Sequence, residues 1–225
     1  MKREQFLGRV RARLAAAPDA LREVSRPAPG SALGARGAAD PDSRELVARF
    51  AAELSRVGGA LIPCADSAEA ASKLEDFLGE SGARSLAAFE RPCFAGLPLD
   101  ALWGRYEVVT PSSHRDFRAR VPQVDVGLSV ADLGVAASGS LLFLAAADRP
   151  RSVTLLPRSH VAILRASTLV ADLGAACRWL ADRGTQASSS IFVTGPSRTS
   201  DIENDLTLGV HGPAAVTVFL LQDPH

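Results

Sequence analysis

The sequence predicts an α/β fold with a mixed, largely parallel sheet flanked by helices. Amphipathic helical segments alternate with short apolar segments between residues 42 and 89, an order typical of parallel strands joined by crossover helices. Strand-like segments then follow one another closely from Val124 to Leu164, which favours antiparallel or hairpin pieces. The apolar content of 47% is enough to fill a core in a chain of 225 residues.

The main domain is expected over residues 42–225, and its first half contains two helix–strand units. Asp42 and Glu45 have capping-box spacing, and Gly58-Gly59 ends the first helix. The apolar face of this helix consists of Leu46, Val47, Phe50, Leu54 and Val57. A short buried strand is expected over 60–63, a helix capped by Ser67 and ending at Gly79, and a second strand over 84–89.

The second half is richer in strands. Further strands are predicted at 106–109, 124–130, 140–146, 152–156, 161–164, 190–194 and 216–221. A helix capped by Ser167 and ended by Gly184 should turn Leu169, Val170, Leu173, Cys177 and Leu180 inward. Another helix is expected around 200–208.

An N-terminal appendage is predicted before the main domain. Residues 3–17 carry Phe6, Leu7, Val10 and Leu14 at helical spacing, which predicts an amphipathic helix (domain span 1–17) that could dock on a partner. Residues 18–41 are rich in Pro, Gly, Ala and Ser without periodicity and are typical of a flexible linker.

The balance of charged residues narrows the classes of partner. The 25 basic and 25 acidic residues cancel, which argues against nucleic acid and against an anionic membrane surface. The first residues are charged, without the apolar core of a signal peptide, and no apolar run approaches the ~18 residues of a membrane span. A cytoplasmic location is therefore expected.

The cysteines argue against a metal centre. Cys64, Cys93 and Cys177 are scattered and form no C-x-x-C pair, so no iron–sulfur cluster or zinc site is predicted and buried structural thiols are expected. The histidines and carboxylates show no metal-ligand spacing, and no Walker loop, G-x-S-x-G or full dinucleotide fingerprint is present. We expect no cofactor held by this chain, and electron transfer would then fall to other proteins.

The segment from Thr194 to Glu203 is the most informative polar motif. A strand ends, the chain turns at Gly195-Pro196, and a helix is expected to begin beneath several hydroxyls. Backbone N–H groups and the side chains of Ser197, Arg198 and Thr199 would then hold a small anion. The alternative is that Thr199 or Ser200 only caps the helix while Arg198 pairs with Asp201 or Glu203.

Other candidates stand near strand ends. His211, between Gly209-Val210 and Gly212-Pro213, and Asp201 are the candidate acid–base residues; a structural role for His211 is the alternative. Small residues at Ser138, Gly139 and Ser140 would allow a ligand or a neighbouring backbone to come close. Arg151 is a further ligand-binding candidate. His160 is as consistent with a structural role as with a functional one, and His114 is interpreted as part of a solvated loop.

Taken in order, these motifs resemble the LutC/YkgG family of lactate-utilisation proteins. The C-terminal pair, Thr194–Glu203 and Gly209–Pro213, carries the resemblance, with Ser138-Gly139-Ser140-Leu141 and the Arg151–His160 segment in support. The match runs from about Asp125 to the C-terminus.

The resemblance implies a LUD domain with a fold like that of the NagB/RpiA/CoA-transferase group, acting beside two iron–sulfur proteins in oxidation of L-lactate to pyruvate. Family members usually carry Glu where this chain has Ala137, which removes an acid, base or ligand. Because the chain offers a donor-rich turn and no redox centre is predicted, we favour an accessory subunit that binds a small anionic ligand. The alternatives are a stand-alone enzyme acting on a phosphorylated or CoA-linked substrate and a non-catalytic scaffold for the iron–sulfur partners.

Overall fold

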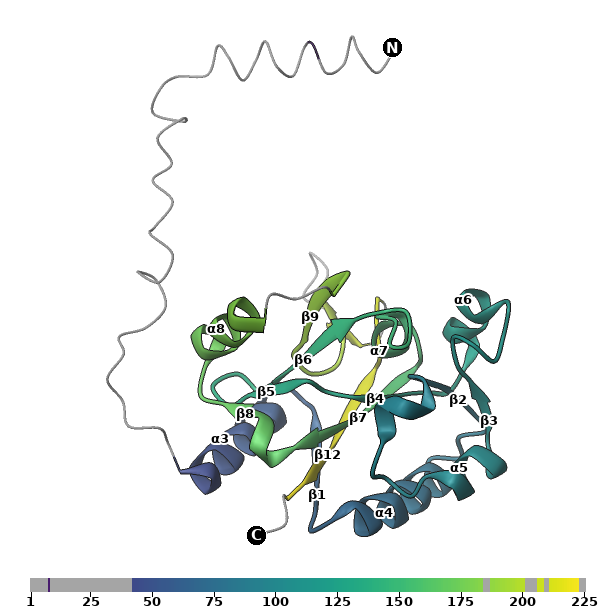
Figure 1. The fold of residues 1–225 in the computed structure, drawn as a ribbon, viewed down its shortest axis with the longest axis horizontal. Helices are drawn as coiled ribbons and strands as arrows, with labels where there is room; N and C mark the ends of the chain where they lie inside the picture. Colours follow the sequence, from purple (N-terminus) through teal and green to yellow (C-terminus); the bar gives the residue numbers. More distant parts are fainter. Residues whose placement is uncertain (1–7, 9–41, 184–186, 201–205, 209–210, 223–225) are drawn as a thin grey trace. The chain divides into compact units, whose positions relative to one another are not determined.

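The computed structural model describes residue 8 and residues 42–183, 187–200, 206–208 and 211–222. Apart from residue 8, the predicted N-terminal helix and linker lie outside these residues, so the domain boundaries stay a prediction. The described part forms two main sheets with helices around them (Figure 1). None of its helices is long and apolar enough to cross a bilayer.

The larger sheet has six strands, and all of its pairings are parallel. Its order is β1 (Ala60–Cys64), β12 (Ala215–Leu221), β7 (Ser159–Arg165), β4 (Val126–Val130), β2 (Ser85–Ala88) and β3 (Glu107–Val109). The predicted α/β class with a largely parallel sheet is confirmed. The edge strand β1 is more exposed than expected, and Cys64 is its buried residue.

The smaller sheet contains the predicted antiparallel pieces. Its order is β8 (Leu169–Val170), β5 (Leu133–Val135), β6 (Ser140–Ala145) and β9 (Ser189–Val193). The hairpin pairing of β5 with β6 and the pairing of β6 with β9 are antiparallel, whereas β5 and β8 are parallel. Strand β5 was not predicted, because its three residues are too few to show periodicity.

Helices and the two sheets are stacked in layers. The helices are α3 (Ser43–Arg56), α4 (Ser67–Glu80), α5 (Asp100–Arg105), α6 (Phe117–Arg120), α7 (Ser152–Leu155) and α8 (Leu173–Arg183). Short 3-10 helices are formed by Arg91–Phe94, Val121–Gln123 and Ala166–Thr168. Figure 1 shows α4 and α5 on the face of the larger sheet that points away from the smaller sheet. Helix α8 packs through Ala176 on Leu133, Val135 and Leu142 of the smaller sheet.

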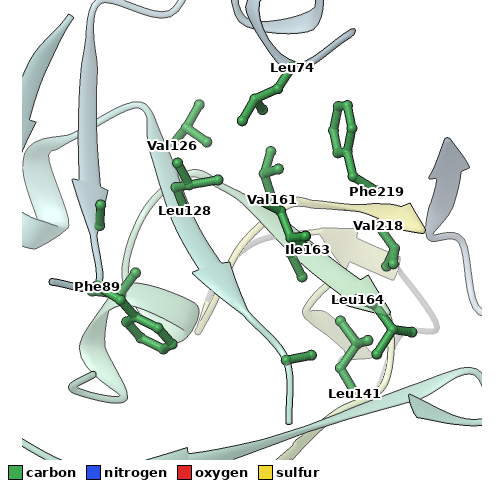
Figure 2. Close-up of a cluster of buried hydrophobic side chains, with 14 of the residues drawn as sticks. Leu74, Phe89, Val126, Leu128, Leu141, Val161, Ile163, Leu164, Val218 and Phe219 are labelled. Atoms are coloured by element: carbon green, nitrogen blue, oxygen red, sulfur yellow. The ribbon is translucent and has the colours of Figure 1, made fainter. Parts of the chain in front are cut away.

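The main core fills both faces of the larger sheet. Leu74 of α4 and Phe219 of β12 lie on one side of the strands, and Leu141 of β6 faces Leu164 of β7 on the other (Figure 2). The rings of Phe77 and Phe219 meet edge to face with centroids 5.8 Å apart. At about 25 cal/mol per Å² of buried apolar surface, this double-sided burial is the main stabilising term.

The first helices begin where the sequence indicates, with one change of cap. Asp42 accepts a hydrogen bond from Arg44 N and starts α3 as predicted. The second helix is capped by Asp66, whose Oδ1 accepts from Ala68 N and Glu69 N, and not by Ser67. Asp caps at least as well as Ser, and the extended backbone of residue 66 suits the cap position.

Two predicted elements differ in the second half of the chain. The strand predicted over 152–156 is wrong: Ser152–Leu155 form the short helix α7, and Pro150 begins a helical turn in which Val153 N bonds to Pro150 O. The helix predicted from Ser167 starts only at Leu173, after strand β8, and Asp172 caps it through a bond from Ala175 N. Leu169 is buried in β8, whereas Leu173 is 55% exposed.

Candidate functional site

The prediction of a helix around residues 200–208 is wrong. Arg198–Ser200 (β10) and Leu206–Leu208 (β11) pair as antiparallel strands, with Thr199 opposite Thr207. This pairing outweighs the local tendency of Thr199 or Ser200 to cap a helix. Asp201 lies outside the described residues. The anion cradle was predicted at a helix N-terminus, and the described residues 198–200 and 206–208 form strands there instead.

Arg198 instead contacts the C-terminus of α3. Its Nη2 donates a hydrogen bond of 2.7 Å to the carbonyl oxygen of Val57, the residue that ends α3. A positive charge there interacts favourably with the unpaired carbonyl groups of the helix end. Gly195 has φ +71°, and a Cβ atom at this position would lie 2.7 Å from the same oxygen. The Gly195–Arg198 turn thus packs on α3.

This contact gives a first prediction. Arg198→Ala should lower the free energy of unfolding by about 1 kcal/mol, since it removes one hydrogen bond to a helix end. Urea denaturation followed by circular dichroism measures the loss. Arg49→Ala is the matched control, because it removes an exposed arginine from α3, the helix that Arg198 contacts. Equal stability of the two variants would contradict a stabilising role for the Arg198–Val57 bond.

The Ser138-Gly139-Ser140 motif lies against the same end of α3. Gly139 has φ +63°, and a Cβ atom there would lie 2.6 Å from Leu54 Cα. The hydroxyl of Ser140 is 2.8 Å from that of Ser138 and 2.6 Å from that of Thr194. Small residues were expected here to let a ligand or a neighbouring backbone come close. The backbone of α3 is what comes close to Gly139.

The two C-terminal motifs lie side by side. Ser197 N donates to Pro213 O at 2.8 Å, and a Cβ atom on Gly212 would lie 3.3 Å from Ser197 Cβ. His211 is exposed next to this contact. The acid–base roles of His211 and Asp201, and the ligand-binding roles of Ser197, Arg198 and Thr199, stay predictions.

Arg151 lies in a different place, on a cleft of about 880 Å³. The cleft is lined by Pro111, residues 114–119, 145–147 and 150–152, and Ser188 and Ser189. We call it the arginine cleft, because Arg115 and Arg118 line it together with Arg151. Its volume is in the upper part of the range of about 300–1,000 Å³ that is typical of small-molecule sites.

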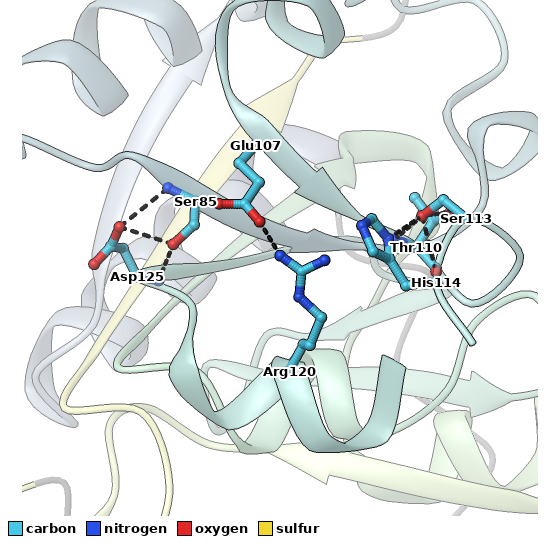
Figure 3. A network of polar contacts seen from close by, with 7 residues as sticks. All are labelled: Ser85, Glu107, Thr110, Ser113, His114, Arg120 and Asp125. Atoms are coloured by element: carbon cyan, nitrogen blue, oxygen red, sulfur yellow. Dashed lines mark hydrogen bonds and ion pairs between the residues drawn. The ribbon is translucent and has the colours of Figure 1, made fainter. Parts of the chain in front are cut away.

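The segment that carries Arg115 and Arg118 is held at both ends, by a turn that begins at Thr110 directly after β3 and by a contact with Glu107 of β3 (Figure 3). At one end, Thr110 N donates to Ser113 Oγ at 2.9 Å, and Ser113 Oγ lies 2.6 Å from Nδ1 of His114. At the other end, Arg120 forms an ion pair with Glu107. Phe117 is buried between them. These contacts hold the cleft wall in place, and Arg115 and Arg118 take no part in them.

The three arginines of the cleft have no ion pair within the described part of the chain, in contrast to their neighbours. Arg120 pairs with Glu107, and Arg149 pairs with Asp132 at 3.0 Å. Asp116 is the one acidic residue among the lining residues. An unneutralised cluster of guanidinium groups in a concavity is suited to bind an anion, since each group offers a planar fork of donors.

Arg151 was a predicted ligand-binding residue, which stays a prediction, whereas the Ser112–Asp116 loop was interpreted as solvated and now lines the cleft. The signal that could have identified it is its position directly after Val109, the last residue of β3. Ligands of α/β sheets gather beyond the carboxyl ends of parallel strands. The sequence alone did not show that residues 145–152 and 188–189 close the opposite side.

His160 has a structural environment. It is fully buried in β7, its Nε2 lies 2.7 Å from Ser129 Oγ, and its ring is 5.5 Å from that of Phe143. Burial lowers the pKa of His160 to about 3, so the imidazole is neutral near pH 7. A neutral ring sealed between two sheets is not placed to exchange protons with a ligand.

The three cysteines are free thiols, and Cys64 is buried as expected while Cys93 and Cys177 are half-buried. Burial, reinforced by the carboxylate of Asp148, raises the pKa of Cys93 to about 11. Burial also raises the pKa of Cys64. Both thiols are therefore protonated near neutral pH and are poor nucleophiles.

Comparisons with known proteins agree on one family. A model of the LUD domain matches residues 47–221. Lactate utilization protein C of Shouchella clausii is 32% identical over 164 residues, which cover 70% of this chain and 71% of that protein. Lactate utilization protein C of an Exiguobacterium species is 31% identical over 189 residues, covering 80% and 79%.

The fold also matches a solved structure. The crystal structure of a DUF162 family protein from Deinococcus radiodurans superposes with a TM-score of 0.59, covering 80% of this chain and 99% of that one. At 20% sequence identity, this likeness supports the fold alone.

Proposed function

The chain belongs to the LUD domain family and is similar to lactate utilization protein C over most of its length, and from this premise we propose that it is the corresponding component of an L-lactate to pyruvate oxidation system. In this proposal it works in the cytoplasm beside iron–sulfur partner proteins and binds a small anionic ligand. The partners carry the electrons.

The observation that supports anion binding is the arginine cleft. Arg115, Arg118 and Arg151 reach it from two separate segments, and none of them is neutralised by a carboxylate among the residues that the structure describes. Unpaired guanidinium groups that repel each other are stabilised when an anion binds between them. This favours the cleft over the Gly195–Arg198 turn, where the guanidinium of Arg198 is already bonded to α3.

A binding role is preferred to a catalytic one because of residue 137. Ala137 follows β5, is half-buried, and donates its backbone N–H to Ala171 O at 3.0 Å. Its methyl group can neither donate nor accept a proton at the position where the family resemblance implies Glu. We therefore assign this chain the binding of a ligand and of its partners, and not the proton transfer of lactate oxidation.

Growth on L-lactate tests the proposal. In a bacterium that has lost its own lactate utilization protein C, this chain should restore growth with L-lactate as the sole carbon source. Arg151→Ala should restore it poorly, because one charged contact contributes about 1.5–3 kcal/mol to binding. Arg49→Ala, outside the cleft, should behave like the unmodified chain.

The outcomes separate the parts of the proposal. If the unmodified chain fails to restore growth although it is expressed and folded, the assignment to lactate oxidation is wrong. If Arg151→Ala restores growth fully, the cleft is not the functional site.

A further inference from the structure

The arginine cleft has more room and more charge than a three-carbon acid needs. Its volume of about 880 Å³ is typical of sites that bury a drug-sized molecule. Three arginines and one aspartate among its lining residues leave a formal excess of two positive charges. A monocarboxylate such as lactate would neutralise half of that excess and leave most of the volume to water.

The positive charges are distributed over two segments. Arg115 and Arg118 lie on the segment attached to β3, and Arg151 lies directly before α7. Helix α7 packs so closely on β4 that a Cβ atom on Gly127 would overlap the carbonyl oxygen of Val153. Because both segments are anchored, the backbone positions that carry the arginines are fixed, and a ligand with two linked anionic groups can contact both segments at once.

The remaining lining suits an organic ester. Ala146, Ala147 and Pro150 offer apolar surface, while Ser152 and Ser189 add hydroxyl donors to the same lining. Arginine forks match phosphate oxygens in pairs, and hydroxyl groups donate to the same oxygens. This combination favours phosphoryl groups attached to an organic body over a bare inorganic ion.

We propose that the arginine cleft binds a diphosphate ester of the nucleoside diphosphate type, with its phosphoryl oxygens on Arg115, Arg118 and Arg151 and its organic part on the alanine and proline residues. This inference rests on the proposed function, because it names the class of the anionic ligand at the same site.

Isothermal titration of ADP into the full chain tests the inference. ADP should bind, with pyrophosphate binding more weakly and inorganic phosphate weakest. Arg115→Gln, Arg118→Gln and Arg151→Gln should each weaken ADP binding about 10-fold or more, the equivalent of ~1.4 kcal/mol. Arg49→Gln should have no effect. All three cleft arginines are exposed, so the variants should keep the thermal midpoint of the parent chain, which calorimetry checks.

Three results would overturn the inference. Tighter binding of L-lactate, pyruvate or the dicarboxylate malonate than of ADP, with the same dependence on the arginines, would retain the cleft but reject the diphosphate class. Binding of ADP that is unchanged in all three variants would place its site elsewhere. Absence of ADP binding, with growth on L-lactate still lost in Arg151→Ala, would reject this inference while the proposed function stands.

Discussion

Gly127→Ala should lower the free energy of unfolding by about 3 kcal/mol, at the upper end of what overpacking a core costs. Gly127 lies in the middle of the larger sheet, in β4. A Cβ atom there would overlap the carbonyl oxygen of Val153 and lie 3.0 Å from Pro157 Cγ. The first of these contacts is with backbone, so α7 or the strand must move. Urea denaturation of the purified variant measures the change.

The same substitution should reach the arginine cleft. Arg151 is the residue that precedes α7, so a shift of this helix displaces one of the three cleft arginines. In conditions where the variant is still folded, we expect weaker ADP binding although no cleft side chain has changed. A displacement of the order of an ångström is enough to break a bidentate contact.

Gly79→Ala is the matched control. Gly79 lies in α4, and a Cβ atom there would meet no atom within 4 Å. Alanine in a helix is favoured over glycine by roughly 0.5–1 kcal/mol, so this variant should be as stable as the parent or slightly more stable. Equal stability of the two glycine variants would contradict the close packing of α7 on β4.

Acidification should destabilise the protein through His160. Burial lowers the pKa of this imidazole from 6.5 to about 3 in the folded chain. Below pH 6.5 the unfolded chain therefore binds a proton that the folded chain does not. Stability is lost as pH falls through this window, and the loss from this one group between about pH 7 and pH 5 is ~2 kcal/mol.

Replacing His160 by leucine separates this effect from the others. His160→Leu should flatten the dependence of unfolding free energy on pH by up to one proton, which is ~1.4 kcal/mol per pH unit. Val161→Ala, one residue further along β7 and also buried, should lower stability by an amount that does not vary with pH. A parent chain and a His160→Leu variant with parallel pH profiles would show that His160 titrates normally in the folded state.

Much of the fold could be predicted because local pattern and tertiary packing agree. Phe50 and Leu54 lie on the apolar face that was predicted for the first helix, and both are fully buried. The strands at 126–130, 159–165 and 215–221 occupy the centre of the larger sheet, where both faces are covered. The sequence of a strand buried on both faces is a nearly continuous apolar run, which the sequence alone reveals.

The predictions failed where a short segment takes its structure from its neighbours. Residues 152–155 contain Val153 and Thr154, which favour strands, yet both are buried in a helical turn that packs on Gly127. Residues 198–200 and 206–208 become strands by pairing with each other. In each case a contact made elsewhere in the chain outweighs a propensity worth less than about 1 kcal/mol per residue.

By itself the sequence determined the α/β class, the positions of the long elements and the motifs of the family, since periodicity and turn residues are local properties. Only the tertiary structure decided which arginines are available to a ligand. Arg198 is bonded to a carbonyl group 141 residues away, whereas Arg115, Arg118 and Arg151 meet at a cleft built from three separate segments. Whether a guanidinium group is neutralised depends on what lies within a few ångströms of it in space, and the order of residues along the chain does not contain that information directly.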